Sequence, residues 1–313
     1  MSPKYFILLL VIGILFPSSG GYAGSSYQYG SNARSIALSN SLISSYNKGY
    51  NPLTNPALLG RKSAELEYGF SYFDMSLDRS IQTLSATIPF PPSASMGLSL
   101  FMTSVDDIQG TNTSGNYTNL YKAWEGFGML SFGIELNRLS AGVNLKILKS
   151  EIDTYSASGI GIDIGFLCRI SSKHQFAFLV NNLHSKYTWD TVNLYEEKFP
   201  KILSLGGSSE MSKSILYLYR IDYSLDSNIL LYKFGIEIDI LSARNIQIEN
   251  DAPAFFRLGL NSKHGSFSPH PSFGFGYNIP MKNKLNLGID YAIDLGMVDE
   301  GISHLFTLTF SKK

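Results

Sequence analysis

Polar and apolar residues alternate with a period of two along most of the chain beyond residue 30. In YKFGIEIDI, residues 232–240, every second residue is aromatic or aliphatic, and Lys, Gly, Glu and Asp stand between them. Residues 139–147 and 285–293 alternate in the same way. A period of two predicts β-strands, each with one apolar and one polar face.

Fourteen strand-like segments follow one another. They cover residues 64–73, 80–90, 94–104, 126–136, 139–149, 158–170, 174–183, 201–209, 213–223, 231–241, 254–263, 271–280, 284–294 and 301–311. Most are about ten residues long, the length of a tilted strand that crosses a bilayer. The connections alternate between short ones, such as 91–93 and 137–138, and longer ones, such as 105–125, 150–157 and 184–200, which is typical of an outer-membrane barrel. The connection 242–253 is longer than this pattern predicts, so the strand count near it stays open by one or two.

A soluble β-sandwich would show the same alternation, with the apolar face turned inward. Three features favour a membrane barrel: an export signal, the strand lengths with their alternating connections, and the closing segment HLFTLTF, which places Phe306, Leu308 and Phe310 on one face. A closed barrel leaves no strand edge unpaired. The predicted fold class is therefore all-β, an antiparallel up-and-down transmembrane β-barrel of about 14 strands.

The first residues have the pattern of a signal peptide. Lys4 precedes an apolar run from Tyr5 to Phe16, and small residues follow up to Ala23. A membrane anchor is the alternative, but this run is shorter than the ~20 residues that a spanning helix needs. We therefore expect a signal peptide at 1–23, an N-terminal segment at 24–62 and a barrel at 63–313.

Composition excludes several function classes. Charged residues make up 16% of the chain, and 25 basic residues balance 25 acidic ones, so no basic surface predicts a nucleic-acid partner. The single cysteine, Cys168, and the five histidines have no metal-ligand spacing. No nucleophile elbow or phosphate loop occurs. The sequence thus predicts neither an enzyme nor a cofactor or metal site.

Residues 30–60 have the sequence GSNARSIALSNSLISSYNKGYNPLTNPALLG. This segment resembles the start of PorV/PorQ-like proteins, which belong to the FadL-type superfamily of outer-membrane β-barrels. Gly30, Ala33 and Arg34 match the family's opening, and Asn55-Pro56-Ala57 matches its Asn-Pro-Ala step, whereas ALSNS and Thr54 depart from its Gly-rich centre and aromatic residue. FRLGL at 256–260, PSFGFGYNI at 271–279 and GIDYAIDLG at 288–296 extend the resemblance over nearly the whole mature chain.

The resemblance implies that the N-terminal segment folds into the lumen as a hatch. Asn can cap a helix start and Pro prevents the helix from beginning earlier, so each Asn-Pro step predicts a tight turn with a short helical start. Ordinary turn residues on the approach to the first strand are the alternative. The candidate hatch or gate residues are Asn51, Pro52, Asn55, Pro56, Ala57 and Leu58.

Charged residues on the polar faces of the strands are expected to point into the lumen, because charge on the lipid face is unfavourable. They would pair with one another, with water or with the hatch. These lumen candidates are Asp163, Arg169, Arg220, Glu237, Asp239, Arg257 and Asp290.

Two functions follow from the resemblance. The PorV/PorQ-like branch implies an interaction or assembly component for secreted or surface proteins, as in type IX secretion, and the chain's moderate length favours this branch. The wider FadL-type superfamily implies instead a passive channel for hydrophobic small molecules such as fatty acids. Both place the protein in the outer membrane of a Gram-negative-type bacterium, in contact with lipid.

Overall fold

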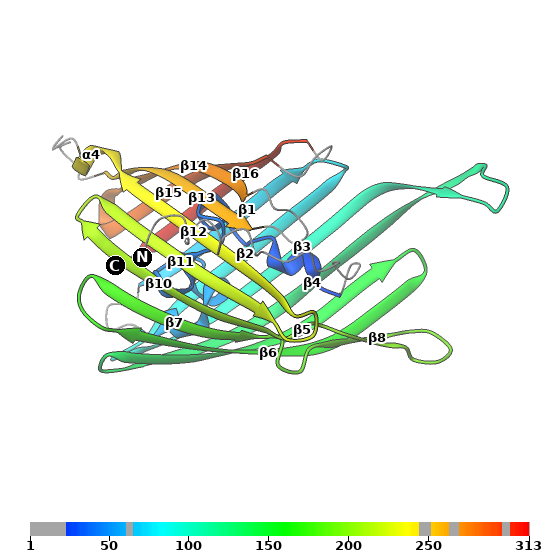
Figure 1. The fold of residues 1–313 in the computed structure, drawn as a ribbon, viewed down its shortest axis with the longest axis horizontal. Helices are drawn as coiled ribbons and strands as arrows, with labels where there is room; N and C mark the ends of the chain where they lie inside the picture. Colours follow the sequence, from blue (N-terminus) through cyan, green and yellow to red (C-terminus); the bar gives the residue numbers. More distant parts are fainter. Residues whose placement is uncertain (1–22, 61–64, 244–251, 263–268, 296–300, 313) are drawn as a thin grey trace, which may run out of the picture.

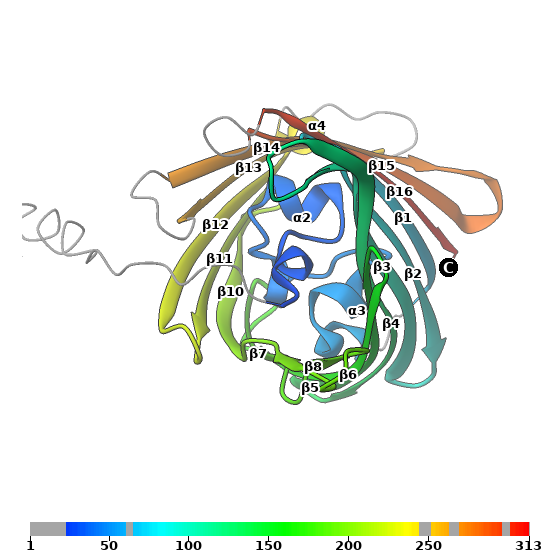
Figure 2. The same cartoon turned by 90° about the vertical axis from the view of Figure 1, so that its right-hand side faces the viewer.

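The computed structural model describes residues 23–60, 65–243, 252–262, 269–295 and 301–312. Fourteen antiparallel strands pair in sequence and close through β1 with β16, which forms a barrel (Figures 1 and 2). The predicted fold class is confirmed. The barrel strands are β1 (Leu66–Met75), β2 (Arg79–Phe90), β3 (Ala94–Thr111), β4 (Tyr117–Leu136), β5 (Leu139–Ile152), β6 (Tyr155–Arg169), β7 (His174–Asn181), β10 (Ile202–Ser212), β11 (Ile215–Ser224), β12 (Ile229–Asp239), β13 (Ala254–Ser262), β14 (Pro269–Pro280), β15 (Leu285–Asp294) and β16 (Ser303–Lys312).

Each barrel strand coincides with one predicted segment to within a few residues, except at one end of the barrel. The predicted connections 105–125 and 150–157 are mostly strand, because β3 runs to Thr111, β4 starts at Tyr117 and a tight turn joins β5 to β6. Likewise, the predicted connection 184–200 contains a small hairpin of β8 (Lys186–Trp189) and β9 (Glu196–Lys198). In the long connection 242–253, the helix α4 (Ile240–Ala243) follows β12, and 244–251 lie outside the described residues.

The two ends of the barrel differ. Strand β1 begins, and strand β16 ends, at the same end of the barrel, which is here called the terminal end. At the opposite, far end, residues 106–122 of β3 and β4 extend as a two-stranded ribbon past the pairing with β2 and β5, which stops at Val105 and Ala123 (Figure 1). The short hairpins 91–93 and 137–138 lie at the terminal end.

The outer surface of the barrel is apolar and its inner surface is polar. Exposed and buried residues alternate strictly along β16, where Phe306, Leu308 and Phe310 point outward and Thr307 and Thr309 inward. This distribution is the reverse of a water-soluble sandwich and is that of a barrel surrounded by lipid. Within the described residues, no helix has the length and apolar character that a membrane-spanning helix requires.

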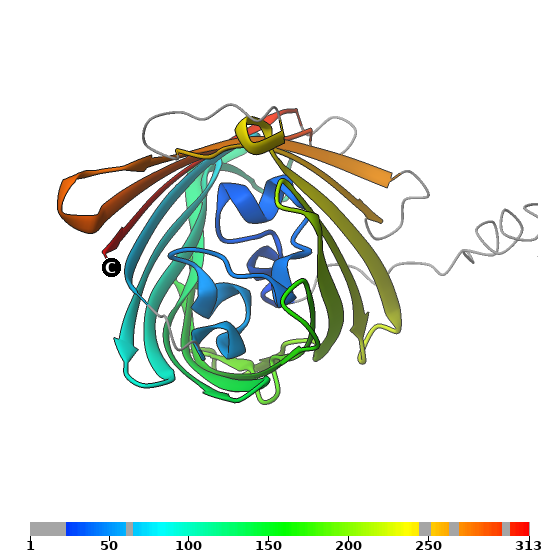
Figure 3. The ribbon, with the colours of Figure 1, turned by 90° about the vertical axis from the view of Figure 1, so that its left-hand side faces the viewer.

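Residues 23–60, here called the inner segment, lie inside the ring of strands (Figures 2 and 3). The segment contains short helices: η1 (Ser25–Gln28), α2 (Ala33–Ala37), η2 (Leu42–Ser44), α3 (Asn51–Thr54) and η3 (Pro56–Leu59). The helix α2 contacts β13–β16, η2 contacts β7, β10 and β11, and η3 contacts β3–β6. The segment therefore touches the wall on several sides. The predicted signal peptide lies outside the described residues, apart from Ala23.

Candidate functional site in the barrel lumen

An aromatic cluster surrounds the start of the inner segment near the far end. The Tyr27 ring meets Phe101 and Phe127 edge-on, with centroids 5.4 and 5.0 Å away, and stacks on Phe199 at 5.9 Å. Its hydroxyl lies 2.5 Å from that of Tyr187. Burial, with the neighbouring Tyr187 and Glu125, raises the pKa of Tyr27, so the phenol stays neutral. This cluster anchors the segment by apolar contact and one hydroxyl pair.

A chain of ion pairs joins the inner segment to the wall. Arg34, at the start of α2, contacts Glu237 on β12 with 2.7 Å between Nη2 and Oε1. Arg257 on β13 donates to Glu237 at 2.6 Å and to Asp290 on β15 at 2.5 Å. Two cations thus meet two carboxylates, an arrangement that compensates the desolvation of all four groups.

A second charged group lies on β11 and β12. Asp222 accepts from Arg220 at 2.6 Å and from Lys233 at 2.7 Å. The hydroxyl of Ser204 donates to Asp222 at 2.5 Å. Arg220 also donates to the Asn40 carbonyl of the inner segment at 3.1 Å. The group is here called the Asp222 cluster.

A third pair lies on β5 and β6. Lys146 and Asp163 are 2.8 Å apart, and Asn144 donates to Asp163 at 3.1 Å. The same Asn144 amide donates to the Pro52 carbonyl of the inner segment at 3.2 Å. All three charged groups therefore reach the inner segment directly or through one neighbour.

The other two lumen candidates lie at the terminal end of the barrel. Arg169 ends β6 and pairs with Glu135 at 2.9 Å, with its side chain partly exposed. Asp239 accepts from the backbone amides of Leu241 and Ser242, so its carboxylate caps α4 and takes no part in the chain of ion pairs that starts at Arg34.

The candidate hatch residues hold the second half of the inner segment. Asn55 caps η3 by accepting from the Ala57 amide at 3.0 Å, and its own amide donates to the Ile43 carbonyl at 2.8 Å. Asn51 does not cap α3, because its side chain accepts from the Asn47 amide instead. Leu58 and Ala57 pack with Ile43 in a cluster that includes wall residues of β6 and β7.

Glycines of the wall form a seat for this half of the segment. Gly133, Gly142 and Gly165 are register neighbours on β4, β5 and β6. A Cβ atom on Gly133 or Gly142 would lie 2.4 or 2.3 Å from the Pro56 carbonyl oxygen, and one on Gly165 would lie 1.9 Å from Asn55 Oδ1. The backbone of η3 therefore lies where side chains would otherwise stand. We call these three residues the glycine seat.

Polar groups line the wall beside α3. Register pairs connect Ser311, Glu67, Thr87, Gly97 and Ser131 in one row across β16 and β1–β4. The Thr87, Ser131 and Ser311 hydroxyls are buried and have no hydrogen-bond partner among the described residues. Water can satisfy such groups, so the terminal half of the lumen offers a polar surface.

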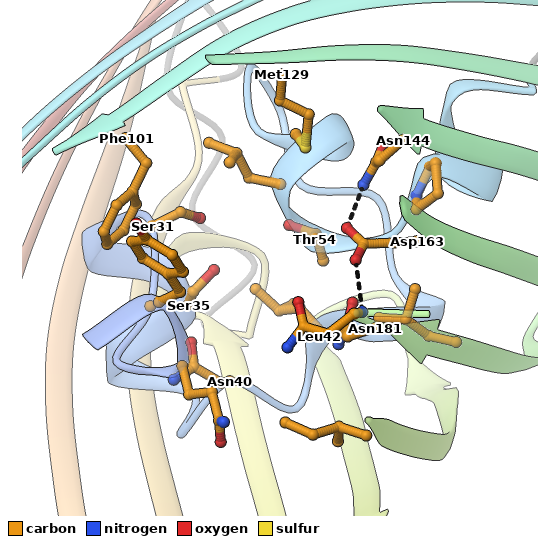
Figure 4. Close-up of a pocket in the computed structure, with 18 of the residues that line it drawn as sticks. Ser31, Ser35, Asn40, Leu42, Thr54, Phe101, Met129, Asn144, Asp163 and Asn181 are labelled. Atoms are coloured by element: carbon orange, nitrogen blue, oxygen red, sulfur yellow. Dashed lines mark hydrogen bonds between the residues drawn. The ribbon is translucent and has the colours of Figure 1, made fainter. Parts of the chain in front are cut away.

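A cavity of about 110 Å³ lies between the inner segment and the wall. Apolar side chains, among them Phe101 and Met129, line one part of it, and Asn144 and Asp163 line another (Figure 4). The Asp222 cluster also borders it. The cavity therefore offers apolar and charged surfaces to one occupant. Among the described residues, no group of three or more His, Cys, Asp or Glu side chains could hold a metal ion.

No protein-family model matches the chain, and no curated protein matches its sequence. Solved structures do match. The Pseudomonas putida toluene transporter TodX shares 14% identity with a TM-score of 0.60, over 88% of this chain and 97% of TodX. The Ralstonia pickettii toluene transporter TbuX shares 12% identity with a TM-score of 0.59, over 91% of this chain and 99% of TbuX. A Pseudomonas aeruginosa FadL homologue shares 9% identity with a TM-score of 0.59, over 90% of this chain and 98% of the homologue.

These likenesses show the fold alone: the chain forms a barrel like those of the two toluene transporters and the FadL homologue. They do not single out the PorV/PorQ-like branch that the sequence suggested. Sequence reasoning also missed the far-end aromatic cluster and the glycine seat. The recurrence of glycine on the polar faces of neighbouring strands was a signal for the seat, but its meaning depends on register, which the sequence does not state.

Proposed function

We propose that the protein is an outer-membrane channel through which small hydrophobic or amphipathic molecules pass without energy input, with the inner segment as its plug. The observation that carries this proposal is the lumen cavity beside the aromatic cluster, lined by Phe101, Phe127 and Met129. Apolar side chains in a concave site are what a small apolar ligand requires. The FadL-type fold supports the same conclusion, and it favours a channel over an enzyme.

The way in which the plug is attached to the wall supports a role for the plug as a gate. Its contacts with the wall are ion pairs, single hydrogen bonds and packing on glycine, and each can be broken without unpairing a barrel strand. Passage requires the plug to shift or leave, because it contacts strands on several sides of the lumen.

Uptake by outer-membrane vesicles tests the channel. Toluene and phenylbutyrate serve as the probes, because the lipopolysaccharide leaflet of the vesicles is a barrier to both. Vesicles with the protein should accumulate a probe faster than vesicles without it, and deletion of residues 24–60 should raise the rate further while the barrel still assembles. Equal rates in vesicles with and without the protein would contradict the channel.

A role in holding a secreted or surface protein is a second candidate. The observation that favours it is the far-end ribbon, where Tyr117 and Leu120 are exposed and the outer strand edges are not paired with another strand of the described residues. Such edges can pair with a strand of another protein. Extraction in mild detergent followed by mass spectrometry separates the two functions: a retained small molecule favours the channel, and a stoichiometric protein partner favours attachment.

A further inference from the structure

Exposed cations gather at the terminal end of the barrel. They are Arg138, Lys173, Lys213, Lys282, Lys284 and Lys312. Within the described part of the chain, none of them forms an ion pair, whereas Lys122 at the far end pairs with Asp106. Among the described carboxylates of the terminal end, Glu210 alone is exposed, while Glu65 and Asp239 are half-buried. Exposed lysine and arginine side chains are charged at neutral pH, so the terminal end carries a surplus of positive charge.

These cations lie at the border of the lipid-facing surface. Lys312 follows Phe310 on the outward face of β16, where exposed and buried residues alternate. Arg138 stands between Leu136 and Leu139, whose side chains are 64% and 59% exposed. Long basic side chains beside an apolar surface extend their charged groups toward the polar headgroups of the bilayer. The surplus charge is therefore expected at the depth of the lipid headgroups.

Three of the lysines come together on neighbouring strands. The short 3₁₀ helix η4 (Lys282–Lys284) joins β14 to β15. Leu285, which follows η4, is the register partner of Lys312 on β16, so the Cα atoms of these two residues are about 5 Å apart. Met281 and Leu285, on either side of η4, have exposed apolar side chains. The three residues Lys282, Lys284 and Lys312 are here called the lysine cluster.

We propose that the terminal end binds anionic phospholipid, with headgroup phosphates at the lysine cluster and acyl chains against Leu308 and Phe310. Basic residues near a membrane surface attract anionic lipid, whereas a zwitterionic headgroup brings no net charge to compensate the surplus. An acidic soluble protein would contact the lysines but not the apolar side chains beside them, because those side chains face lipid. The proposal concerns the outer surface of the barrel and does not depend on what passes through the lumen.

Native mass spectrometry of the full chain tests this binding. The protein is reconstituted into vesicles of equal parts phosphatidylglycerol and phosphatidylcholine with the same acyl chains, and the lipids that it retains after release in mild detergent are counted. The cluster variant replaces all three residues of the lysine cluster by Gln. The matched control removes three exposed lysines near the far end, through Lys149→Gln, Lys198→Gln and Lys201→Gln. Heat-modifiable gel mobility confirms that each barrel is folded.

The wild-type protein should retain phosphatidylglycerol at least about fivefold over phosphatidylcholine, the scale of one basic residue at a lipid surface. The cluster variant should lose that preference and the far-end control should keep it. Equal retention of both lipids by the wild-type protein overturns the proposal, and so does a preference that the cluster variant keeps or the far-end control loses. The same extraction from native outer membranes tests the alternative partner: an acidic protein that the wild type retains in place of lipid, and that the cluster variant releases, overturns the proposal as well.

Discussion

The glycine seat allows a sharp test of how the plug is held. In Gly142→Ala, the new Cβ atom would lie 2.3 Å from both the carbonyl carbon and the carbonyl oxygen of Pro56. Ordinary contact begins near 3.4 Å, so the backbone of η3 must retreat by about 1 Å. The clashing atoms belong to the Pro56 backbone, which cannot rotate away as the end of a flexible side chain can. Asn55, the N-cap of η3, would therefore move together with the helix.

Overpacking of this kind typically costs 1–3 kcal/mol. Because the plug bears the strain and the barrel strands do not, most of that free energy should weaken plug docking. An equilibrium shifted by 1–3 kcal/mol changes about 5- to 150-fold. The population with a displaced plug should rise by that factor.

Single-channel recording in planar bilayers measures that population as open probability. Gly128→Ala is the matched control, since Gly128 lies on β4 and its added Cβ would meet only the Leu100 side chain at 3.6 Å. Gly142→Ala should open far more often than wild type and Gly128→Ala should match wild type. If Gly142→Ala opens no more often than Gly128→Ala, although both barrels are folded, the seat does not hold the plug.

Three further predictions concern the polar anchors. Arg34→Gln should loosen the plug but leave Glu237 paired with Arg257, so protease cleavage of the inner segment should accelerate with no change in barrel melting; unchanged cleavage would contradict this. Arg257→Ala should lower the melting temperature markedly, because it strips Glu237 and Asp290 of a buried partner at a cost of about 3–5 kcal/mol; melting as in wild type would refute it. Asn55→Ala should cost about 1 kcal/mol as a lost cap, seen as faster hydrogen exchange at the η3 amides, and exchange at the wild-type rate would exclude this capping role.

The strands were predictable because their signal is local. Alternation along residues 232–240 or 301–311 reports a face exposed to lipid and a face turned inward, whichever strand lies beside it. Asn-Pro at 55–56 is local in the same sense, and the structure places a capped turn of η3 there. The far-end strand extensions escaped prediction, because paired hairpin residues outside the membrane need not alternate in polarity.

The arrangement of the inner segment inside the barrel could not be predicted from the sequence, because it depends on contacts between residues far apart along the chain. Arg34 meets Glu237 across 203 positions, and the three glycines of the seat become one surface only through strand register. The sequence by itself determined a closed sheet with a polar interior. Only the tertiary structure decided which charges pair, because electrostatic compensation in a lumen is set by distance in space and not by position along the chain.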